Sequence, residues 1–174
     1  RKPSEIHQEF IDAVFHVEPP MSAAEQREIF ESILEDTLGA DCGIEVAQAI
    51  HDQFSSQIRE HKESKSAEPL IMTAGEIGKV LLECGVTEEN VAAFQVQCGE
   101  RFGVGAVLDP ANLIDPGKYE VKTAQATIQV DPEFSYAVTT RVIDGRAYLL
   151  LPADDIQVNG LPIQVTNGQE TETI

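Results

Sequence analysis

The chain has 174 residues, of which 42% are apolar and 6% aromatic, and it contains no tryptophan. This length fits one domain or two small ones, and the few aromatic residues argue against a carbohydrate-binding face or a stacking surface for single-stranded nucleic acid. The 30 acidic residues outnumber the 12 basic ones, for a formal charge of −18. A surface of that sign repels phosphate backbones and anionic membranes, so we expect neither nucleic acid nor membrane as a partner.

The three cysteines, at positions 42, 84 and 98, form no closely spaced pair. An odd number without close spacing fits a reducing compartment, so we expect a cytoplasmic protein. No apolar run is long enough to cross a bilayer, and the polar residues after Arg1 do not form a signal peptide. Because the chain begins without Met, we also expect it to be part of a longer protein.

The first elements are expected to be helices. Apolar side chains at helical spacing predict one helix over residues 4–17, ending before a Pro-Pro pair. In the next segment Ser22 and Glu25 have the spacing of a capping box, and Gly39 is a typical helix stop. The apolar stripe between them, expected to be buried, consists of Ile29, Phe30, Ile33, Leu34 and Leu38.

A third helix is predicted over residues 44–61, with one apolar stripe and one polar face. The polar segment 62–68 lacks periodicity and is our candidate for a boundary between a helical segment, 1–66, and the remainder, 67–174; the two could equally form one continuous domain. The stripe expected to face inward consists of Ala47, Ile50, Phe54 and Ile58, and the face expected to point outward of Gln48, Asp52, Ser55 and Arg59.

Two short helices follow, marked by the same kinds of capping and terminating residues. Thr73 with Glu76 predicts a second capping box, and Gly85 ends that helix. Thr87 predicts the cap of the next helix, on which Phe94 and Cys98 face inward. The intervening turn is one or two residues long, so the pattern predicts an αα-hairpin.

The segment 103–118 is rich in Gly and Pro and reads as a connector, with a turn of helix at 111–114. After Tyr119 the apolar period changes to two. The dipeptides Asp144-Gly145 and Asn159-Gly160 each predict a two-residue hairpin turn, and Pro162 predicts an edge strand. We therefore expect an α+β fold: N-terminal helices with the αα-hairpin, then an antiparallel β-meander of four to five strands that buries one face against the helices.

Metal sites are not predicted, because the histidines do not share a helical face and the cysteines lack zinc spacing. The pair His51-Asp52 is interpreted as a partly exposed pair on the surface of a helix. Adjacent carboxylates such as Glu88-Glu89 and Asp154-Asp155 are expected in so acidic a chain. No catalytic, cofactor-binding or metal-ligating residue is assigned, and no cofactor is expected.

Nucleophilic catalysis lacks a motif, since no Gly-x-Ser-x-Gly turn is present. Cys84 and Cys98 are interpreted as small apolar core residues. Cys42, close to a predicted helix start that could acidify its thiol, is a weak candidate nucleophile without a base. The glycines at 99, 103 and 105 follow a helix rather than a strand and are interpreted as helix termination, not as a phosphate loop.

Several segments together resemble a bacterial domain-of-unknown-function family, number four-three-one-seven in that series. They are the strand residues 119–123, 128–133, 140–148 and 158–160 and, before them, the αα-hairpin over 73–102. The resemblance covers the last hundred residues well and the earlier helices loosely, and is to the C-terminal part of the family's longer members. That family has no assigned activity, so the resemblance implies no site residue.

Three hypotheses for function follow. The first is a non-enzymatic interaction or assembly module, with a protein partner or self-association, because a well-capped fold carries no catalytic motif. The alternative is part of an enzyme, or its regulatory half, whose active residues lie in a missing N-terminal portion. The third is an accessory nucleoid protein, from a loose similarity of the strand–Asp-Gly–strand pattern; the acidic charge argues against direct DNA contact.

Overall fold

A computed structural model of the chain describes residues 20–166. The predicted helix over 4–17 and the tail beyond residue 166 lie outside these residues. The elements in chain order are α2 (Ala23–Leu38), η1 (Gly39–Asp41), α3 (Ile44–Ser64), β1 (Met72–Thr73), α4 (Ala74–Glu83), α5 (Glu88–Arg101), β2 (Val107–Leu108), α6 (Pro110–Leu113), β3 (Tyr119–Lys122), β4 (Thr127–Val130), η2 (Pro132–Ala137), β5 (Thr139–Ile143), β6 (Arg146–Leu150), β7 (Gln157–Val158) and β8 (Leu161–Pro162).

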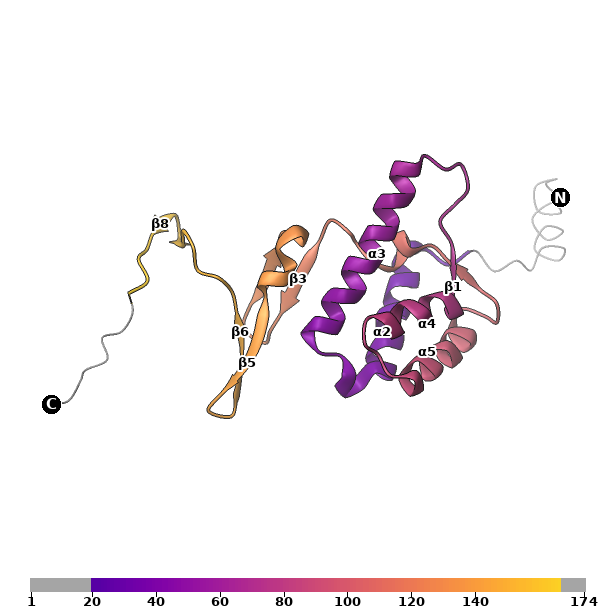
Figure 1. Cartoon of the computed structure of the whole chain (residues 1–174), viewed down its shortest axis with the longest axis horizontal. Coiled ribbons are helices and arrows are strands. Elements are labelled where there is room, and N and C mark those ends of the chain that lie inside the picture. Colours follow the sequence, from indigo (N-terminus) through magenta and orange to yellow (C-terminus); the bar gives the residue numbers. More distant parts are fainter. Residues whose placement is uncertain (1–19, 167–174) are drawn as a thin grey trace, which may run out of the picture.

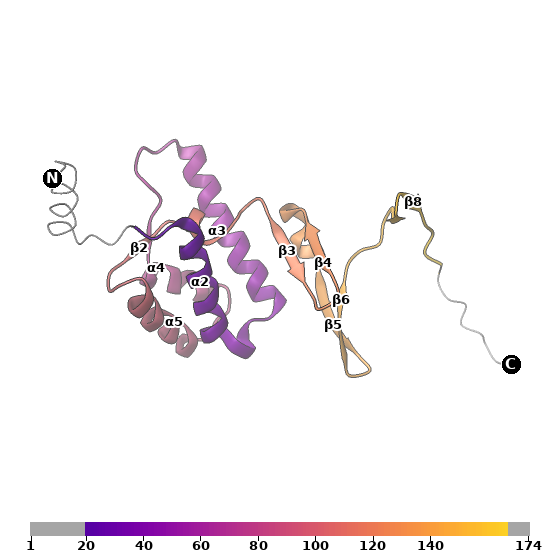
Figure 2. The same ribbon diagram turned by 180° about the vertical axis from the view of Figure 1, so that it is seen from behind.

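Helices α2–α6 form a helical body, residues 20–118, and the strands after it form a hairpin arm, residues 119–165. The arm extends away from the body beyond α3 in both views (Figures 1 and 2). The α+β class, with helices first and antiparallel strands last, is therefore confirmed.

The helix ends are determined by local residues. Ser22 caps α2 and Thr73 caps α4, and each forms the predicted capping box with the glutamate three residues on. Thr87 accepts a hydrogen bond from the amide of Asn90 at the start of α5. Each cap satisfies amide groups that the first turn of a helix leaves unpaired. The αα-hairpin of α4 and α5 is thus confirmed.

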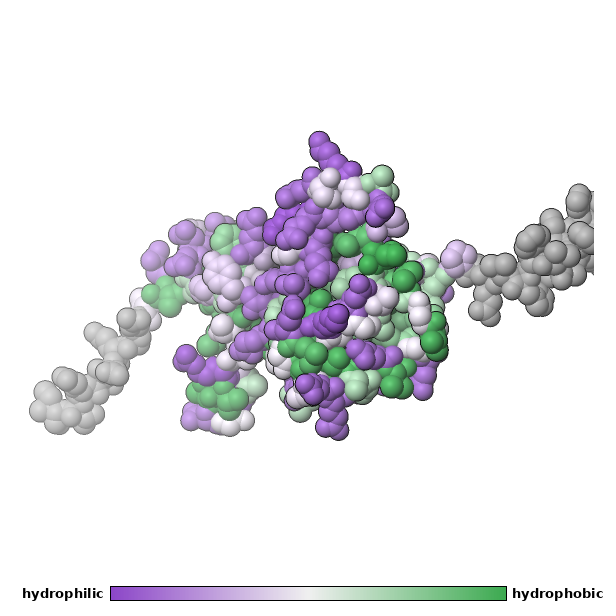
Figure 3. Space-filling model, turned by 45° about the vertical axis from the view of Figure 1, so that its right-hand side comes forward, coloured by the Kyte–Doolittle hydropathy of each residue, from purple (hydrophilic) through white to green (hydrophobic). Residues whose placement is uncertain are grey.

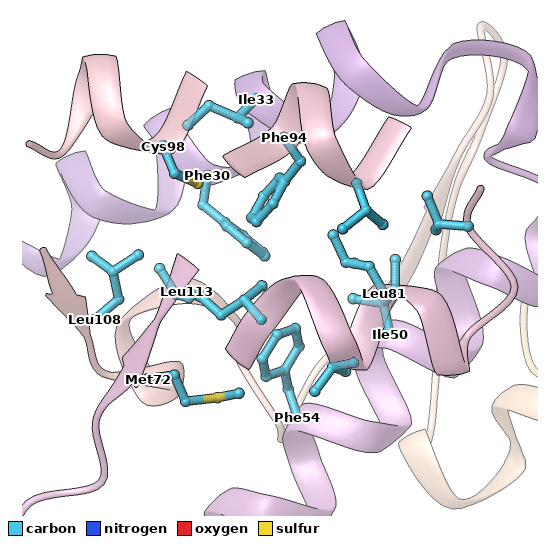
Figure 4. Close-up of a cluster of buried hydrophobic side chains, with 14 of the residues drawn as sticks. Phe30, Ile33, Ile50, Phe54, Met72, Leu81, Phe94, Cys98, Leu108 and Leu113 are labelled. Atoms are coloured by element: carbon cyan, nitrogen blue, oxygen red, sulfur yellow. The ribbon is translucent and has the colours of Figure 1, made fainter. Parts of the chain in front are cut away.

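Three phenylalanines occupy the centre of the helical body. Phe30 of α2 lies between Phe54 of α3 and Phe94 of α5, with ring centroids 6.0 Å and 6.1 Å away and near-perpendicular planes. Figure 4 shows these rings among the surrounding aliphatic side chains. All three are at most 1% exposed, and edge-to-face packing adds to the stabilisation from burial.

The inward face of α3 differs from the prediction at one edge. Ile50, Phe54 and Ile58 are buried as predicted, but Ala47 is exposed and Gln48 is half-buried. The Gln48 side-chain amide donates a hydrogen bond to Ser135 Oγ of η2, 3.2 Å away. Because η2 packs against this side of α3, a polar residue is drawn inward. The helix also continues to Ser64, into the segment predicted as a linker.

The strands do not join into one meander, which corrects that part of the prediction. Hydrogen bonding groups them into four two-stranded antiparallel sheets: β1–β2, β3–β4, β5–β6 and β7–β8. The two predicted hairpin turns are confirmed, since Asp144, Gly145, Asn159 and Gly160 all have positive φ. All of β5 is exposed, however, and β6 is exposed or half-buried. The β5–β6 hairpin therefore does not bury a sheet face against the helices, whereas Tyr119 at the start of β3 is buried.

The pair β1–β2 was not predicted. Met72 pairs with Leu108 and Thr73 with Val107, which brings together the start of α4 and the segment after α5. Met72 and Leu108 are buried in the same apolar cluster as the three phenylalanines. This cluster draws on residues before and after the predicted boundary at 66 and 67; the division into domains stays a prediction.

Candidate functional site

His51 of α3 lies where the helical body meets the arm. Its Nε2 atom is 3.2 Å from the carbonyl oxygen of Asp115 and 3.0 Å from that of Lys118. Because a carbonyl only accepts, Nε2 carries a proton. The ring also packs edge-on against Tyr119, the first residue of β3, with centroids 5.5 Å apart. His51 thus fastens the connector and the start of β3 to α3.

The other side of His51 faces a polar cleft of about 650 Å³ between α3 and η2. Two polar atoms beside it, His51 Nδ1 and Ser55 Oγ, are buried and have no hydrogen-bond partner. Buried polar atoms are normally paired, so the unpaired ones mark this cleft as a place for a polar ligand. The cleft is lined by His51, Asp52, Ser55, Ser56, Arg59, Pro116, Asp131, Pro132, Glu133, Ser135 and Tyr136.

The charges around this cleft favour a cation. Asp52, Asp131 and Glu133 contribute carboxylates, and Arg59 contributes the one guanidinium among the lining residues. With Nε2 protonated, a neutral His51 presents Nδ1 as an acceptor. Asp52 Oδ1 lies 3.6 Å from that nitrogen. The cleft therefore suits a positively charged group that also donates hydrogen bonds.

The cleft lacks an activated nucleophile. Ser55 lies one helical turn after His51, but no hydrogen bond joins their side chains, and a serine needs a base within hydrogen-bond reach to attack a substrate. Within residues 20–166, no group of three or more His, Cys, Asp or Glu side chains is arranged to hold a metal ion.

The cysteines offer no activated thiol either. Cys98 is buried, and desolvation raises its pKa to about 11. Burial also raises the pKa of the Cys84 thiol, with a smaller contribution from Glu83. Cys42 is exposed and precedes α3, yet partial desolvation raises its pKa. This is opposite to the acidification expected for a reactive thiol.

The sequence interpretation of this region was incomplete. Asp52 is half-exposed, as predicted, but the side chain of His51 is only 14% exposed and makes the contacts described above. Ser55 was expected to face outward and instead lines the cleft. The spacing of four between His51, Ser55 and Arg59 was a usable signal, because it places all three on one face of α3.

The arm carries most of the exposed large apolar side chains. Among the described residues fifteen such side chains are exposed, and ten of them lie within residues 134–165. Figure 3 shows hydrophobic groups on the hairpin that projects below the molecule as well as on the body. The ten are Phe134, Tyr136, Val142, Ile143, Tyr148, Leu151, Val158, Leu161, Ile163 and Val165.

The β5–β6 hairpin of the arm also differs in charge from the acidic body. Residues 139–151, which comprise the β5–β6 hairpin and its flank, contain two basic residues, Arg141 and Arg146, and one acidic residue, Asp144. This stretch therefore has a net positive charge in a chain whose formal charge is −18. No helix in the part of the chain that the structure covers is long and apolar enough to span a membrane.

Comparison with known proteins gives one positive result. No curated protein and no solved structure matches this sequence. The family described as "Domain of unknown function (DUF4317)" matches residues 1–161. This confirms the family suggested by the strand and αα-hairpin residues; that the chain corresponds to the C-terminal part of the family's members stays a prediction. Because the match covers nearly the whole chain, the protein belongs to the DUF4317 family.

Proposed function

We propose that this chain is a non-enzymatic interaction or assembly module that binds protein through its hairpin arm. The observation that carries the proposal is the concentration of exposed apolar side chains in residues 134–165. Contiguous exposed apolar surface on a protein commonly marks an interaction site, and burying it stabilises a complex by about 25 cal/mol per Å² before the costs of association are subtracted.

The strand edges support the same function. A two-stranded hairpin presents unpaired N–H and C=O groups along both outer edges, which another strand can extend. An isolated hairpin is also only marginally stable in water. A partner that adds a strand would both satisfy the edge and cover apolar side chains such as Val142 and Tyr148, which are 69% and 42% exposed.

Site-specific photo-crosslinking in the native cells tests this proposal. A photoreactive phenylalanine analogue replaces Tyr148 in the arm, and in a matched control it replaces Gln53, which is exposed on α3 of the body. We expect protein adducts from position 148 and none above background from position 53. Equal yields, or no adducts at position 148, would contradict the proposal.

A second candidate function is that of a ligand-binding part of an enzyme, favoured by the polar cleft beside His51. Its unpaired His51 Nδ1 and Ser55 Oγ and its excess of carboxylates suit an amine. Putrescine, a diamine, is a suitable probe in an NMR titration, with NaCl at equal ionic strength as the control.

We expect putrescine to shift the amide signals of Ser55 and Tyr136, and the Asp52→Asn variant to weaken that response. Shifts no larger than those from NaCl would show that the cleft does not bind an amine.

A further inference from the structure

A separate cleft, called the α5 cleft below, lies on the helical body between the second half of α5, the loop that follows it and the β1–β2 pair. It encloses about 460 Å³, and Glu100 is the only charged residue among the described residues that line it. A Cβ added at Gly103 or Gly105 would meet no atom within 4 Å, so the hollow has room for large side chains. The α5 cleft is lined by residues 73–75, 95–96, 98–100, 102–106 and 108.

Exposed apolar side chains of the body gather at the α5 cleft. Of the fifteen exposed large apolar side chains among the described residues, five lie in the body. Two of these five, Val96 and Val104, line the cleft and are 61% and 98% exposed, and Val107 lies between two lining residues. Figure 3, in which the β1 side of Figure 1 comes forward, shows hydrophobic groups on this part of the body. An apolar patch with a hollow at its centre commonly marks a binding surface.

Residues 4–17 supply an apolar face that requires a partner surface. Ile6, Phe10 and Val14 recur every four residues, which places them on one side of the predicted helix. The two prolines at 19 and 20 disfavour one continuous helix with α2, so the apolar side has to be covered by packing of this segment against another surface. The opposite side of the predicted helix is polar and consists of Glu5, Gln8, Glu9, Asp12 and His16.

The described chain begins beside the strands that border the α5 cleft. Gln26 Nε2 donates a hydrogen bond to the carbonyl oxygen of Met21, 3.0 Å away, and Gln26 Oε1 accepts one from Asn112 Nδ2, 3.3 Å away. Asn112 follows Leu108, a lining residue and the end of β2, by four positions. In Figures 1 and 2 the start of α2 lies at the end of the body that holds β1 and β2. The three residues 18–20 span at most about 11 Å, so they hold the segment close to this end of the body.

Tethering favours the chain's own segment over any other occupant. A segment joined by a short linker meets a neighbouring cleft at an effective concentration on the order of millimolar. A second copy of the chain, or another protein, matches this only when its own concentration is that high.

Charge favours the α5 cleft over the other large cleft that α2 borders. The latter, of about 660 Å³ between α2, α3 and β3, has six charged side chains in its lining. An apolar face placed over them would remove these charges from water at a high cost in free energy. The six are Arg27, Glu31, Asp115, Lys118, Glu120 and Lys122.

We propose that the apolar face of residues 4–17 covers the α5 cleft of the same chain, with Phe10 in the hollow beside Val104. This contact extends the apolar cluster of the body, because Cys98 and Leu108 belong both to that cluster and to the lining of the cleft. It does not depend on the function proposed for the arm, which uses a different surface.

Photo-crosslinking within the purified full chain tests the contact. The photoreactive analogue p-benzoylphenylalanine replaces Phe10 or, as the matched control, Gln8 on the polar side of the predicted helix. Mass spectrometry of the irradiated and digested protein then identifies the peptide to which the analogue is joined. We expect adducts of monomer mass between position 10 and residues 95–108, and a several-fold lower yield of them from position 8.

The amide NMR signals of two cleft glycines give a second measurement. Phe10→Asp and Gln8→Asp each add one negative charge, but only the first removes an apolar side chain from the proposed contact. We expect Phe10→Asp to shift the amide signals of Gly99 and Gly105, and Gln8→Asp to leave them unchanged. The two variants together separate loss of the contact from a change in charge.

Other results overturn the inference. Crosslinks of dimer mass would assign the α5 cleft to the segment of a second copy, and crosslinks to residues 27–34 or 113–122 would place the segment over the charged cleft between α2 and β3. No crosslinks from position 10, equal yields from positions 8 and 10, or unchanged glycine signals in Phe10→Asp would show that the apolar face does not cover the α5 cleft.

Discussion

The fifteen side chains of the buried apolar cluster all come from residues 30–113, whereas ten of the fifteen exposed large apolar side chains come from residues 134–165. The helical body and the hairpin arm thus use apolar residues in opposite ways. In the body, helices from distant parts of the chain pack around Phe30. In the arm, each strand has a single neighbour, so the outer edges of each hairpin remain open.

If the arm binds protein as proposed, stability and interaction are located in separate parts of this chain. A body with its own core can remain folded without help, whereas two-stranded hairpins gain little stability alone. Changes in the body should therefore affect global unfolding, and changes in the arm should affect association and local order.

The largest expected effect is on the core. Phe54 is 0% exposed, whereas Phe134 in the arm is 54% exposed. We expect Phe54→Ala to lower the free energy of unfolding by about 3–5 kcal/mol, because it leaves a cavity. Phe134→Ala should change it by less than about 0.5 kcal/mol. Urea denaturation followed by circular dichroism measures both free energies. Similar losses for the two variants would contradict the contrast between a buried core in the body and exposed apolar side chains in the arm.

A smaller effect is expected at the junction of body and arm. His51→Ala removes the Nε2 contacts to the carbonyls of Asp115 and Lys118 and the packing on Tyr119. We expect a loss of about 1–2 kcal/mol, seen as faster amide hydrogen exchange over residues 115–119.

His61 supplies the control for this prediction. Its Nε2 atom also contacts a backbone carbonyl, that of Glu68 at 2.7 Å, but away from the arm. His61→Ala should leave exchange over 115–119 unchanged. If both variants accelerate exchange over residues 115–119 equally, the contacts of His51 do not hold that segment against α3.

An effect confined to the arm is expected at the β5–β6 turn. Gly145 has φ +77°, and an alanine there is strained by about 1 kcal/mol. We expect Gly145→Ala to weaken cross-strand nuclear Overhauser contacts within β5–β6 without lowering the urea midpoint of the body. Gly75→Ala is the control, since a Cβ at that position meets nothing closer than 3.8 Å; it should leave the contacts within β5–β6 unchanged and should not lower the urea midpoint.

The smallest effect concerns acid pH. Hydrogen bonds from Lys122 and then Lys118 lower the pKa of Glu120 from 4.5 to about 2. A lowered folded-state pKa stabilises β3–β4 above pH 4.5, and this contribution is lost as the pH falls from about 4.5 towards 2. The carboxyl carbon shift of Glu120 should titrate in NMR near pH 2. Titration near 4.5 would show that the ion pairs do not persist.

Features determined by neighbouring residues could be predicted from the sequence. A serine or threonine with a glutamate three positions on forms a capping box wherever a helix starts, so the ends at Ser22 and Thr73 were correct. The turns at Asp144-Gly145 and Asn159-Gly160 were correct because positive φ is required there. Each of these signals operates over a few residues.

Features that depend on distant contacts could not be predicted. Gln48 faces inward because its side chain donates a hydrogen bond to Ser135, which lies 87 positions further along the chain. No local sequence pattern indicates that contact. The same holds for the polar cleft: the spacing of His51, Ser55 and Arg59 defines one wall, but the opposite wall comes from η2. Alternation indicates strands and their hairpin turns, yet it does not specify whether separate hairpins join into one sheet.

The β1–β2 pair bears on the order in which the chain folds. Hairpins with two-residue turns close within microseconds, whereas the pairing of Met72 with Leu108 must close a loop of more than thirty residues, at an entropic cost that grows with loop length. We expect α4 and α5 to pack first and thereby bring the two strands together. Pulsed hydrogen exchange during refolding should protect amides of α4 and α5 before those of β1 and β2, and the reverse order would contradict this sequence of events.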